Sequence, residues 1–256
     1  MQTCTSPAFT GTASRNRKTA IEVPVDPRIC SVLEVLAIVR TRSGGGHGYL
    51  IEFIPHGETR VRRKILSQAA LLGRPEEALK ALRDIGVSVL QKHAKLVRDY
   101  LDSQHLRFSA ERPEDFWESV DLVGWHSPEC FVLPSEIIGN QNGVWFNLCG
   151  EPAQYDKRGH LADWQQNVAA LCVGNPYLLF AVSSSLSGPL LEPLNIQSIG
   201  NHLHGDSSTG KTTSLDVATS VWGPRDFRLT WSQTVNRLEE HAASRCDTAL
   251  CWMRAI

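Results

Sequence analysis

The sequence of 256 residues lacks a strong charge of either sign, because 26 Lys and Arg residues stand against 27 Asp and Glu residues. This balance argues against a uniformly basic nucleic-acid binder, so any contact with nucleic acid must be local. The chain also lacks an apolar run of the roughly 18 to 20 residues that cross a bilayer. Its longest candidate, YLLFAVSSSLSGPLL from Tyr177, contains several serines and is interpreted as a buried helix. No membrane partner is expected.

The cysteines form no recognisable metal-binding or disulfide pattern. The seven cysteines are an odd number at scattered positions, without a C-x-x-C pair. This pattern fits neither a metal site nor a secreted disulfide scaffold, and it predicts reduced thiols and a cytoplasmic location. The first 20 residues contain no acid and no apolar signal-peptide core. That composition is shared by transit peptides and disordered arms, and we expect a disordered arm at residues 1–27.

The region after this arm is rich in strand patterns. The stretches SVLEVLAIVR, GYLIEFI and TRVRRKIL, separated by Gly-rich turns, predict an antiparallel meander over residues 31–66. Two helices are predicted next, one from Pro75 in RPEEALKALRDIG and one from Ser88 in SVLQKHAKLVRDYL. Short apolar pieces at 122–150 predict a second group of antiparallel strands, in which Trp125 and Trp145 pack.

These patterns divide the chain. We expect a β-rich α+β N-terminal domain at 28–150 and a helical connection at 151–195. In residues 196–256 the order becomes strand, Gly-rich turn, helix, strand, helix, strand, beginning with IQSIGNHLH and ending with FRLTW, QTVNRLEEHAASR and TALCWM. That alternation is typical of a parallel sheet in an α/β fold. The expected class is therefore α/β, with an incomplete RecA-like P-loop NTPase core.

The stretch GDSSTGKT matches the phosphate-binding pattern G-x-x-x-x-G-K-[ST] between the predicted strand and helix. Gly205 permits the turn, and Gly210 lets the backbone approach a phosphate whose charge faces amide groups at the helix start. Lys211 is predicted to reach the β- and γ-phosphates, and the Thr212 hydroxyl to bind Mg²⁺. The expected cofactors are ATP and Mg²⁺. The predicted binding residues are Gly205, Asp206, Ser207, Ser208, Thr209, Gly210, Lys211, Thr212 and Thr213.

Two further groups are weaker candidates. Arg60, Arg62 and Lys64 share one face of a predicted strand and form a local basic patch that could contact DNA phosphates. The alternative is an edge strand guarded by charge. His202 and His204 flank the predicted strand end, but they lack a third partner at metal-ligand spacing and are interpreted as structural.

The acids that usually serve a phosphate loop are missing. P-loop ATPases use a carboxylate at a neighbouring strand end to hold Mg²⁺, and commonly a second to activate water. TALCWM is instead followed by Arg254 and Ala255. Glu239 and Glu240, on the helix after the second predicted strand, could approach the nucleotide, and Glu239 is the catalytic candidate; the favoured alternative is that this pair forms a solvated helix face. Read one base out of frame, Cys-Trp-Met-Arg encodes Leu-Asp and, with an AGA or AGG arginine codon, Glu. A frameshift or sequencing error is therefore hypothesised to have truncated the protein and left it deficient in hydrolysis.

Four stretches together closely resemble domain-of-unknown-function family 927: GWHSPECFVLPSEIIG, NPYLLFAVSSSLSGPLL, HLHGDSSTGKTTSLDVATSVWG and LTWSQTVNRLEEHAASRCDTAL. The resemblance runs from about residue 30 to the last residues. It implies a helicase-like P-loop ATPase of phages, plasmids and integrated elements, often beside primase-type domains, that acts in replication of the element. It also implies a homo-oligomer for full-length members. Its post-loop pattern falls on Thr230, Trp231, Thr234, Asn236 and Glu239, without assigning their roles.

The expected function is accordingly an ATP-binding, helicase- or primase-associated protein in DNA replication of a mobile element, with defective hydrolysis. Two alternatives stay open. One is a truncated pseudogene product without activity, and the other is a small-molecule kinase built on the same phosphate loop. A GTPase is disfavoured because the sequence lacks an N-K-x-D guanine-binding pattern.

Overall fold

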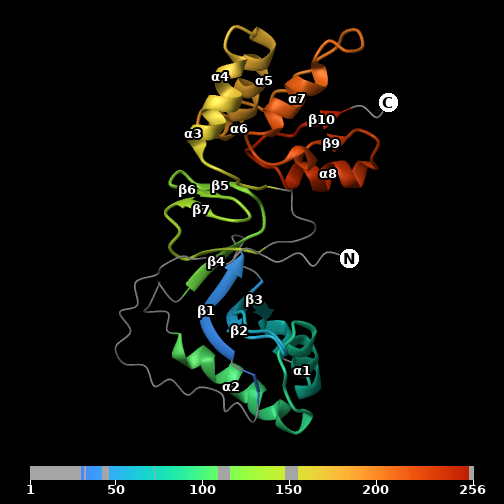
Figure 1. Ribbon diagram of the computed structural model, residues 1–256. Coiled ribbons are helices and arrows are strands. Elements are labelled where there is room, and N and C mark those ends of the chain that lie inside the picture. Colours follow the sequence, from blue (N-terminus) through green and yellow to red (C-terminus); the bar gives the residue numbers. More distant parts are fainter. Residues whose placement is uncertain are drawn as a thin grey trace. The chain divides into compact units, whose positions relative to one another are not determined.

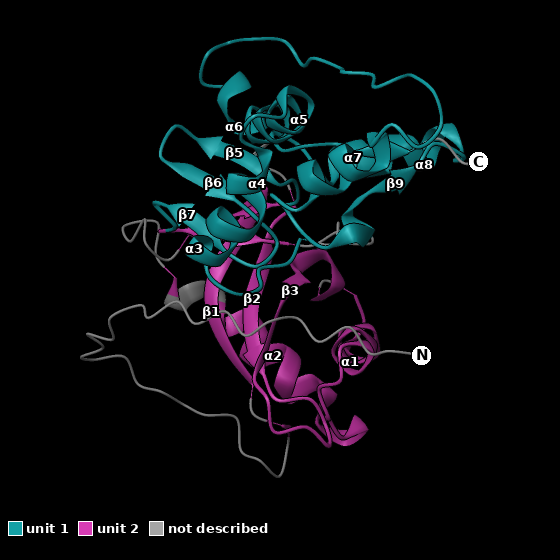
Figure 2. Cartoon of the chain, turned by 45° about the horizontal axis from the view of Figure 1, so that its top comes forward, with its two compact units in different colours: residues 1–9, 121–141, 148–256 teal, residues 10–120, 142–147 magenta. Residues whose placement is uncertain are grey.

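The computed structural model describes residues 30–31, 33–41, 46–71, 73–108, 116–147 and 155–253 (Figure 1). The arm predicted at residues 1–27 and the residues after Met253 lie outside the described residues. The fold is mixed α/β, and its described residues form two compact units (Figure 2). Unit 2 draws on residues 10–120 and 142–147, and unit 1 on residues 121–141 and 148–256.

Unit 2 is built on a curled, mixed five-stranded sheet in the order β3-β2-β1-β4-β8. The predicted antiparallel meander, β3-β2-β1, is confirmed and forms one side of the sheet, and β4 and β8 extend it by parallel pairing. The strands are β1 (Leu33–Thr41), β2 (Gly48–Phe53), β3 (Arg62–Ser67), β4 (Phe116–Val120) and β8 (Val144–Phe146).

Both faces of this sheet carry apolar side chains, and β1 changes register within its length. The pairing of β1 with β2 shifts between Val35 and Ala37. Val35 and Ile38 therefore lie in one core cluster, whereas Ala37 and Val39 lie in the other. The larger cluster is closed by α1 (Pro75–Asp84) and α2 (Ala94–Arg107), with the short helices η1 (Gln68–Leu71) and η2 (Gln91–His93) beside them.

The second predicted strand group is only partly correct. Strand β4 was not predicted, because its pairing with β1 joins segments far apart in sequence and its own pattern is short. Strand β8 pairs with β4 rather than with the strands before it. Trp145 consequently packs on the cluster of Ala37, Val39 and Leu50 in unit 2, whereas Trp125 packs on Phe131 in unit 1. The expectation that the two tryptophans share one group was wrong.

Unit 1 begins with an antiparallel meander of β5 (Gly124–Ser127), β6 (Cys130–Val132) and β7 (Ile137–Gly139). Helices follow, and then a parallel pair of short strands on either side of one helix. The helices are α3 (Leu161–Trp164), η4 (Gln165–Ala169, π-helical), α4 (Ala170–Cys172), α5 (Pro176–Leu186), α6 (Gly188–Leu191) and α7 (Lys211–Thr219). The remaining elements are η5 (Arg225–Phe227), β9 (Leu229–Thr230), α8 (Val235–Ala243) and β10 (Trp252–Met253).

The predicted alternation at residues 196–256 is present except at its start. β9 and β10 pair in parallel, as expected for FRLTW and TALCWM. Residues 196–204, where the first strand was predicted, have no regular structure, and Ile196 and Ile199 are exposed. Among the described residues no strand pairs with this segment, and an unpaired extended chain cannot form a ladder of hydrogen bonds.

Helix α5 is less buried than its composition predicted. Asn175 caps it by accepting hydrogen bonds from the backbone N–H groups of Tyr177 and Leu178. Only Ala181 and Ser185, one helical turn apart, are buried, and Tyr177 is 70% exposed. The helix thus contacts its neighbours through one narrow stripe of small side chains. In the described part of the chain, no helix is long and apolar enough to cross a membrane.

A pair of glycine substitutions tests the tight packing in unit 1. A Cβ at Gly124, whose φ is +106°, would lie 2.5 Å from Asp247 Oδ2. A Cβ at Gly174, with φ of +83°, would meet nothing within 4 Å. We expect Gly174→Ala to cost about 1–2 kcal/mol from backbone strain alone, and Gly124→Ala to cost at least about 1 kcal/mol more by overpacking. Urea unfolding of both variants measures the difference, and equal losses would contradict the described contact.

Candidate nucleotide-binding site

The loop before α7 contains three residues with positive φ angles. Gly210 caps the helix in the left-handed region, with φ of +86°. Gly205 and Ser208 also have positive φ angles, of +144° and +61°. The first backbone bond of the helix runs from Ser214 N–H to the Gly210 carbonyl, 2.9 Å away. The N–H groups before Ser214 therefore lack intrahelical acceptors, and in the described residues no side chain caps them.

Lys211 folds back over this loop. Its Nζ donates hydrogen bonds to the Gly205 carbonyl at 2.9 Å, to the Asp206 carbonyl and to Thr209 Oγ1 at 3.2 Å. Thr209 Oγ1 in turn donates to the Asp206 carbonyl, at 3.0 Å. An ammonium group has three donors, so the loop oxygens account for all of them. The lysine thereby lies across the loop whose amide groups would face a phosphate.

Helix α7 is held from behind by α5 and α3–η4. Ala181 of α5 packs against Ala218 of α7 and Cys251 beside β10. The Ser185 hydroxyl donates to the Ala218 carbonyl at 2.7 Å. Trp164 Nε1 donates to Ser220 Oγ at 3.0 Å. The C-terminal half of α7 is thus fixed, whereas its N-terminal loop, residues 205–210, is exposed.

An ion pair fixes α7 to the segment that enters β9. The Asp216 carboxylate accepts a hydrogen bond from Arg228 Nη1 and lies 3.6 Å from Arg225 Nε. The Arg228 side chain is only 11% exposed. A charge-assisted bond in such a half-buried place is stronger than an exposed pair. The Asp216 carboxylate therefore serves a structural contact between α7 and the segment before β9.

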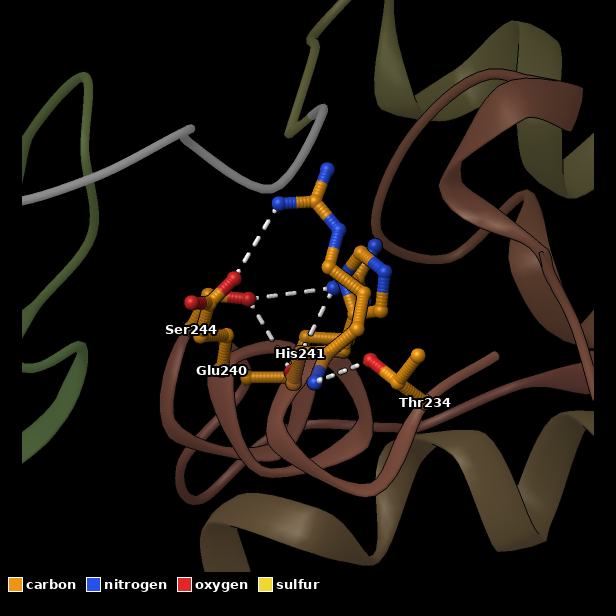
Figure 3. Close-up of polar contacts among 6 residues, drawn as sticks. Thr234, Glu240, His241 and Ser244 are labelled. Carbon is orange, nitrogen blue, oxygen red and sulfur yellow. Dashed lines mark hydrogen bonds and ion pairs between the residues drawn. The ribbon is translucent and has the colours of Figure 1, made fainter.

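The other predicted residues lie along β9 and α8. Thr234 caps α8 by accepting a hydrogen bond from the Arg237 N–H at 3.4 Å, and Arg237 Nη1 lies 3.1 Å from Glu240 Oε2 (Figure 3). Thr230 ends β9. All five residues of the post-loop pattern are exposed: Thr230, Trp231, Thr234, Asn236 and Glu239. Among the described residues, no hydrogen bond or ion pair joins any of them to residues 205–213, so a catalytic role for Glu239 stays a prediction.

A buried arginine that sequence reasoning missed joins η5 to the end of α8. Arg245 is 5% exposed, and its guanidinium stacks 4.6 Å from the Phe227 ring and donates to the Phe227 carbonyl at 3.1 Å. It also donates to the His241 carbonyl at 3.4 Å and to Ser244 Oγ at 3.1 Å (Figure 3). Burial lowers the pKa of this guanidinium. A cation at a helix C-terminus is favourable, but nothing in the local sequence pattern signals one here.

The turn that follows α8 is enclosed from several sides. Trp125 N–H donates to Asp247 Oδ2 at 2.9 Å. A Cβ at Gly188 would lie 2.4 Å from the Thr248 carbonyl oxygen, so only glycine fits there. The Tyr155 hydroxyl shares a 2.7 Å hydrogen bond with Thr248 Oγ1. These contacts fix the approach of the chain to β10.

The residues suit a nucleotide's phosphates better than they suit a complete metal site. The Thr212 hydroxyl is exposed at the start of α7, where it could bind Mg²⁺. β10 itself carries Trp252 and Met253, and Arg254 follows in the sequence. Within the described ranges, no three His, Cys, Asp or Glu side chains gather as metal ligands. The carboxylate that normally accompanies the threonine is thus not provided by β10.

The candidate DNA patch on β3 is partly neutralised. Arg62 pairs with Glu58 at 2.7 Å, and the intervening Arg63 pairs with Glu52 at 2.8 Å. Strand β3 lies at the edge of its sheet, which matches the alternative of a charge-guarded edge. His202 and His204 are exposed, with ring centroids 6.1 Å apart.

The enclosed tyrosine predicts a dependence of stability on pH. Burial raises the pKa of Tyr155 from 10.0 to about 12, although its bond with Thr248 and the charge of Arg245 partly oppose this. The Tyr155 hydroxyl therefore stays neutral to a higher pH in the folded state than in the unfolded state. Its contribution to the free energy of unfolding is complete below pH 10 and falls by about 2–3 kcal/mol as the pH rises toward 12. Tyr155→Phe should lose less unfolding free energy than wild type between these pH values. The exposed Tyr177→Phe is the control, and it should follow wild type.

Comparison with known proteins finds a likeness at the level of the fold. Nothing among the curated proteins matches the sequence. A solved structure described as "SCCmec type IV Cch - active helicase" is similar over 83% of this chain, with a TM-score of 0.63 and 20% sequence identity. The chain spans only 42% of that protein's length. At this identity the likeness establishes a shared fold.

The family comparison covers nearly the whole sequence. The match extends over residues 8–252, further toward the N-terminus than the resemblance from about residue 30 had indicated. It includes the phosphate-loop pattern, α8 and both strands of the parallel pair up to Trp252. The chain therefore belongs to the family described as Domain of unknown function (DUF927).

Proposed function

We propose that the chain binds ATP with Mg²⁺ through residues 205–213, as part of a RecA-like P-loop core. The observation that carries this proposal is the arrangement of Lys211 and Gly210 around a helix start without a side-chain cap. Such a helix start attracts anions through its free N–H groups and its dipole. The sequence pattern adds the spacing that phosphate loops require.

Each residue has a distinct part in this binding. Gly210 turns the chain so that the N–H groups at the start of α7 face the phosphates. The loop oxygens already satisfy the charge of Lys211 before a nucleotide binds. When a nucleotide binds, Lys211 exchanges these bonds for bonds to phosphate oxygens. The Thr212 hydroxyl is the ligand for Mg²⁺, which neutralises part of the phosphate charge when bound.

We further propose that hydrolysis by this chain is slow. Arg254 and Ala255 stand where a metal-binding carboxylate and a water-activating carboxylate would follow the strand. Loss of a general base alone typically reduces the rate by about 10²- to 10⁴-fold. Glu239 is exposed on α8 and is the remaining candidate for a base.

The biological role we propose is DNA replication of a mobile element, by a helicase-like protein that forms homo-oligomers. Its support is family membership and the similarity to a protein described as an active helicase. Because the chain corresponds to less than half of that protein, movement along DNA is proposed for the complete assembly. Nucleotide binding is the part of the proposal that can be measured with this chain alone.

Substitution of Lys211 tests nucleotide binding directly. Lys211→Ala should weaken the binding of fluorescent N-methylanthraniloyl-ATP with Mg²⁺ by about 10- to 100-fold, because charge-assisted bonds to phosphate are lost. Lys157→Ala removes an exposed lysine elsewhere in unit 1 and should leave the affinity unchanged. If wild-type protein binds no nucleotide, or if both variants bind like wild type, the proposal is wrong.

A second substitution separates metal binding from phosphate binding. Thr212→Ala should retain affinity in EDTA and lose most of the gain that Mg²⁺ gives to wild type. Release of inorganic phosphate, measured with the same proteins, tests the expectation of slow hydrolysis. Rapid turnover that disappears in Lys211→Ala would overturn that expectation while supporting the binding site.

A further inference from the structure

Trp231 combines high exposure with a fixed position. It is 61% exposed, immediately after β9. Its backbone N–H donates to the Met253 carbonyl at 2.9 Å, and its own carbonyl accepts from Gln233 N–H at 2.9 Å. These bonds immobilise the backbone on both sides of the ring, so the exposure is not that of a frayed loop.

The ring is also held by aromatic neighbours. Trp231 and Trp252 meet edge to face, with centroids 5.4 Å apart and an interplanar angle of 76°. Trp252 makes the same kind of contact with His241, at 6.1 Å and 76°. Edge-to-face contacts fix ring orientation and leave the broad face of the outermost ring available. A binding surface that is already ordered loses little entropy when a ligand arrives.

The position and surroundings of the ring suit a nucleic acid. β9 and β10 run parallel, and ligands of parallel sheets bind beyond the carboxyl ends of the strands, where Trp231 lies. Residues 229–236 contain no Asp or Glu, so no carboxylate of this segment opposes a phosphate backbone. Gln233, Thr234 and Asn236 are exposed beside the ring in sequence and offer hydrogen-bond donors.

We propose that Trp231 stacks on an unpaired base of single-stranded DNA, with Trp252, which itself contacts His241, holding its ring in place. The choice of DNA rests on the proposed function, whereas the stacking site rests on the geometry of the three rings. Proteins that bind single strands use such exposed aromatic platforms. Small-molecule sites instead enclose most of their ligand's surface. The exposure of Trp231 therefore favours a base of a strand over the base of the bound nucleotide.

The test measures the anisotropy of a fluorescein-labelled oligo(dT) of 20 nucleotides as the protein is added. Trp231→Ala should weaken binding by about 5- to 150-fold, the loss that corresponds to one base–aromatic stack. Trp231→Phe keeps a ring and should stay within about threefold of wild type. Tyr177→Ala, which removes an aromatic side chain that is 70% exposed on α5, is the matched control and should bind like wild type.

Parallel titrations with N-methylanthraniloyl-ATP keep this test separate from that of the phosphate loop. Trp231→Ala should bind the nucleotide normally, and Lys211→Ala should bind oligo(dT) normally without nucleotide. If Trp231→Ala loses nucleotide but not oligo(dT), the ring holds the nucleotide's base and the proposal fails. It also fails if wild type does not bind oligo(dT), or if the loss in Trp231→Ala follows dissociation of an oligomer on size exclusion.

Photo-cross-linking provides a measurement that needs no variant. An oligonucleotide containing 5-iododeoxyuridine forms a covalent bond with an aromatic side chain against which the base lies. We expect irradiated complexes of wild-type protein to give a cross-linked peptide that contains Trp231. Cross-links confined to other aromatic residues would overturn the assignment, whatever the oligo(dT) affinities are.

Discussion

The left-handed backbone at Gly210 is the constraint on which the candidate site depends. It directs the chain into α7 so that the first N–H groups of the helix point out of the protein without a capping side chain. No Cβ would meet any atom within 4 Å there, so the requirement for glycine is conformational rather than steric. Lys211 then covers the exposed loop oxygens, and α5 keeps the helix from moving away. A rigid helix behind an open loop is a common arrangement for a binding site.

Local chemistry was predictable from the sequence, whereas pairing over long distances was not. The turn residues and spacing of GDSSTGKT predicted where α7 begins, and Pro75 predicted the start of α1. The pairing of β4 with β1 and of β8 with β4 could not be anticipated, because each pair joins segments that other secondary-structure elements separate in the chain. The strand expected at 196–204 does not form for a related reason. Alternating apolar residues without a neighbouring strand cannot make a ladder of backbone hydrogen bonds.

The same division applies to the site. The phosphate-loop residues follow from a short motif, and the structure gathers Gly205, Asp206, Thr209 and Lys211 into one network. Arg245, Asp247 and Trp252 carry no motif. Their partners, such as Phe227 and Trp125, lie 18 and more residues away, and only the folded chain brings them together. Side chains that support a site are therefore harder to find by pattern than those that touch its ligand.

The turn at residues 246–248 has a consequence for how related chains can differ. Asp247 adopts a φ of +52°, Gly124 leaves no room beside its carboxylate, and Gly188 leaves none beside the Thr248 carbonyl. The stretches around Gly124, Gly188 and Asp247 must therefore all fit one local backbone conformation. In the history of the family, a larger residue at either glycine would require a remodelled turn, so these positions are expected to covary across its members.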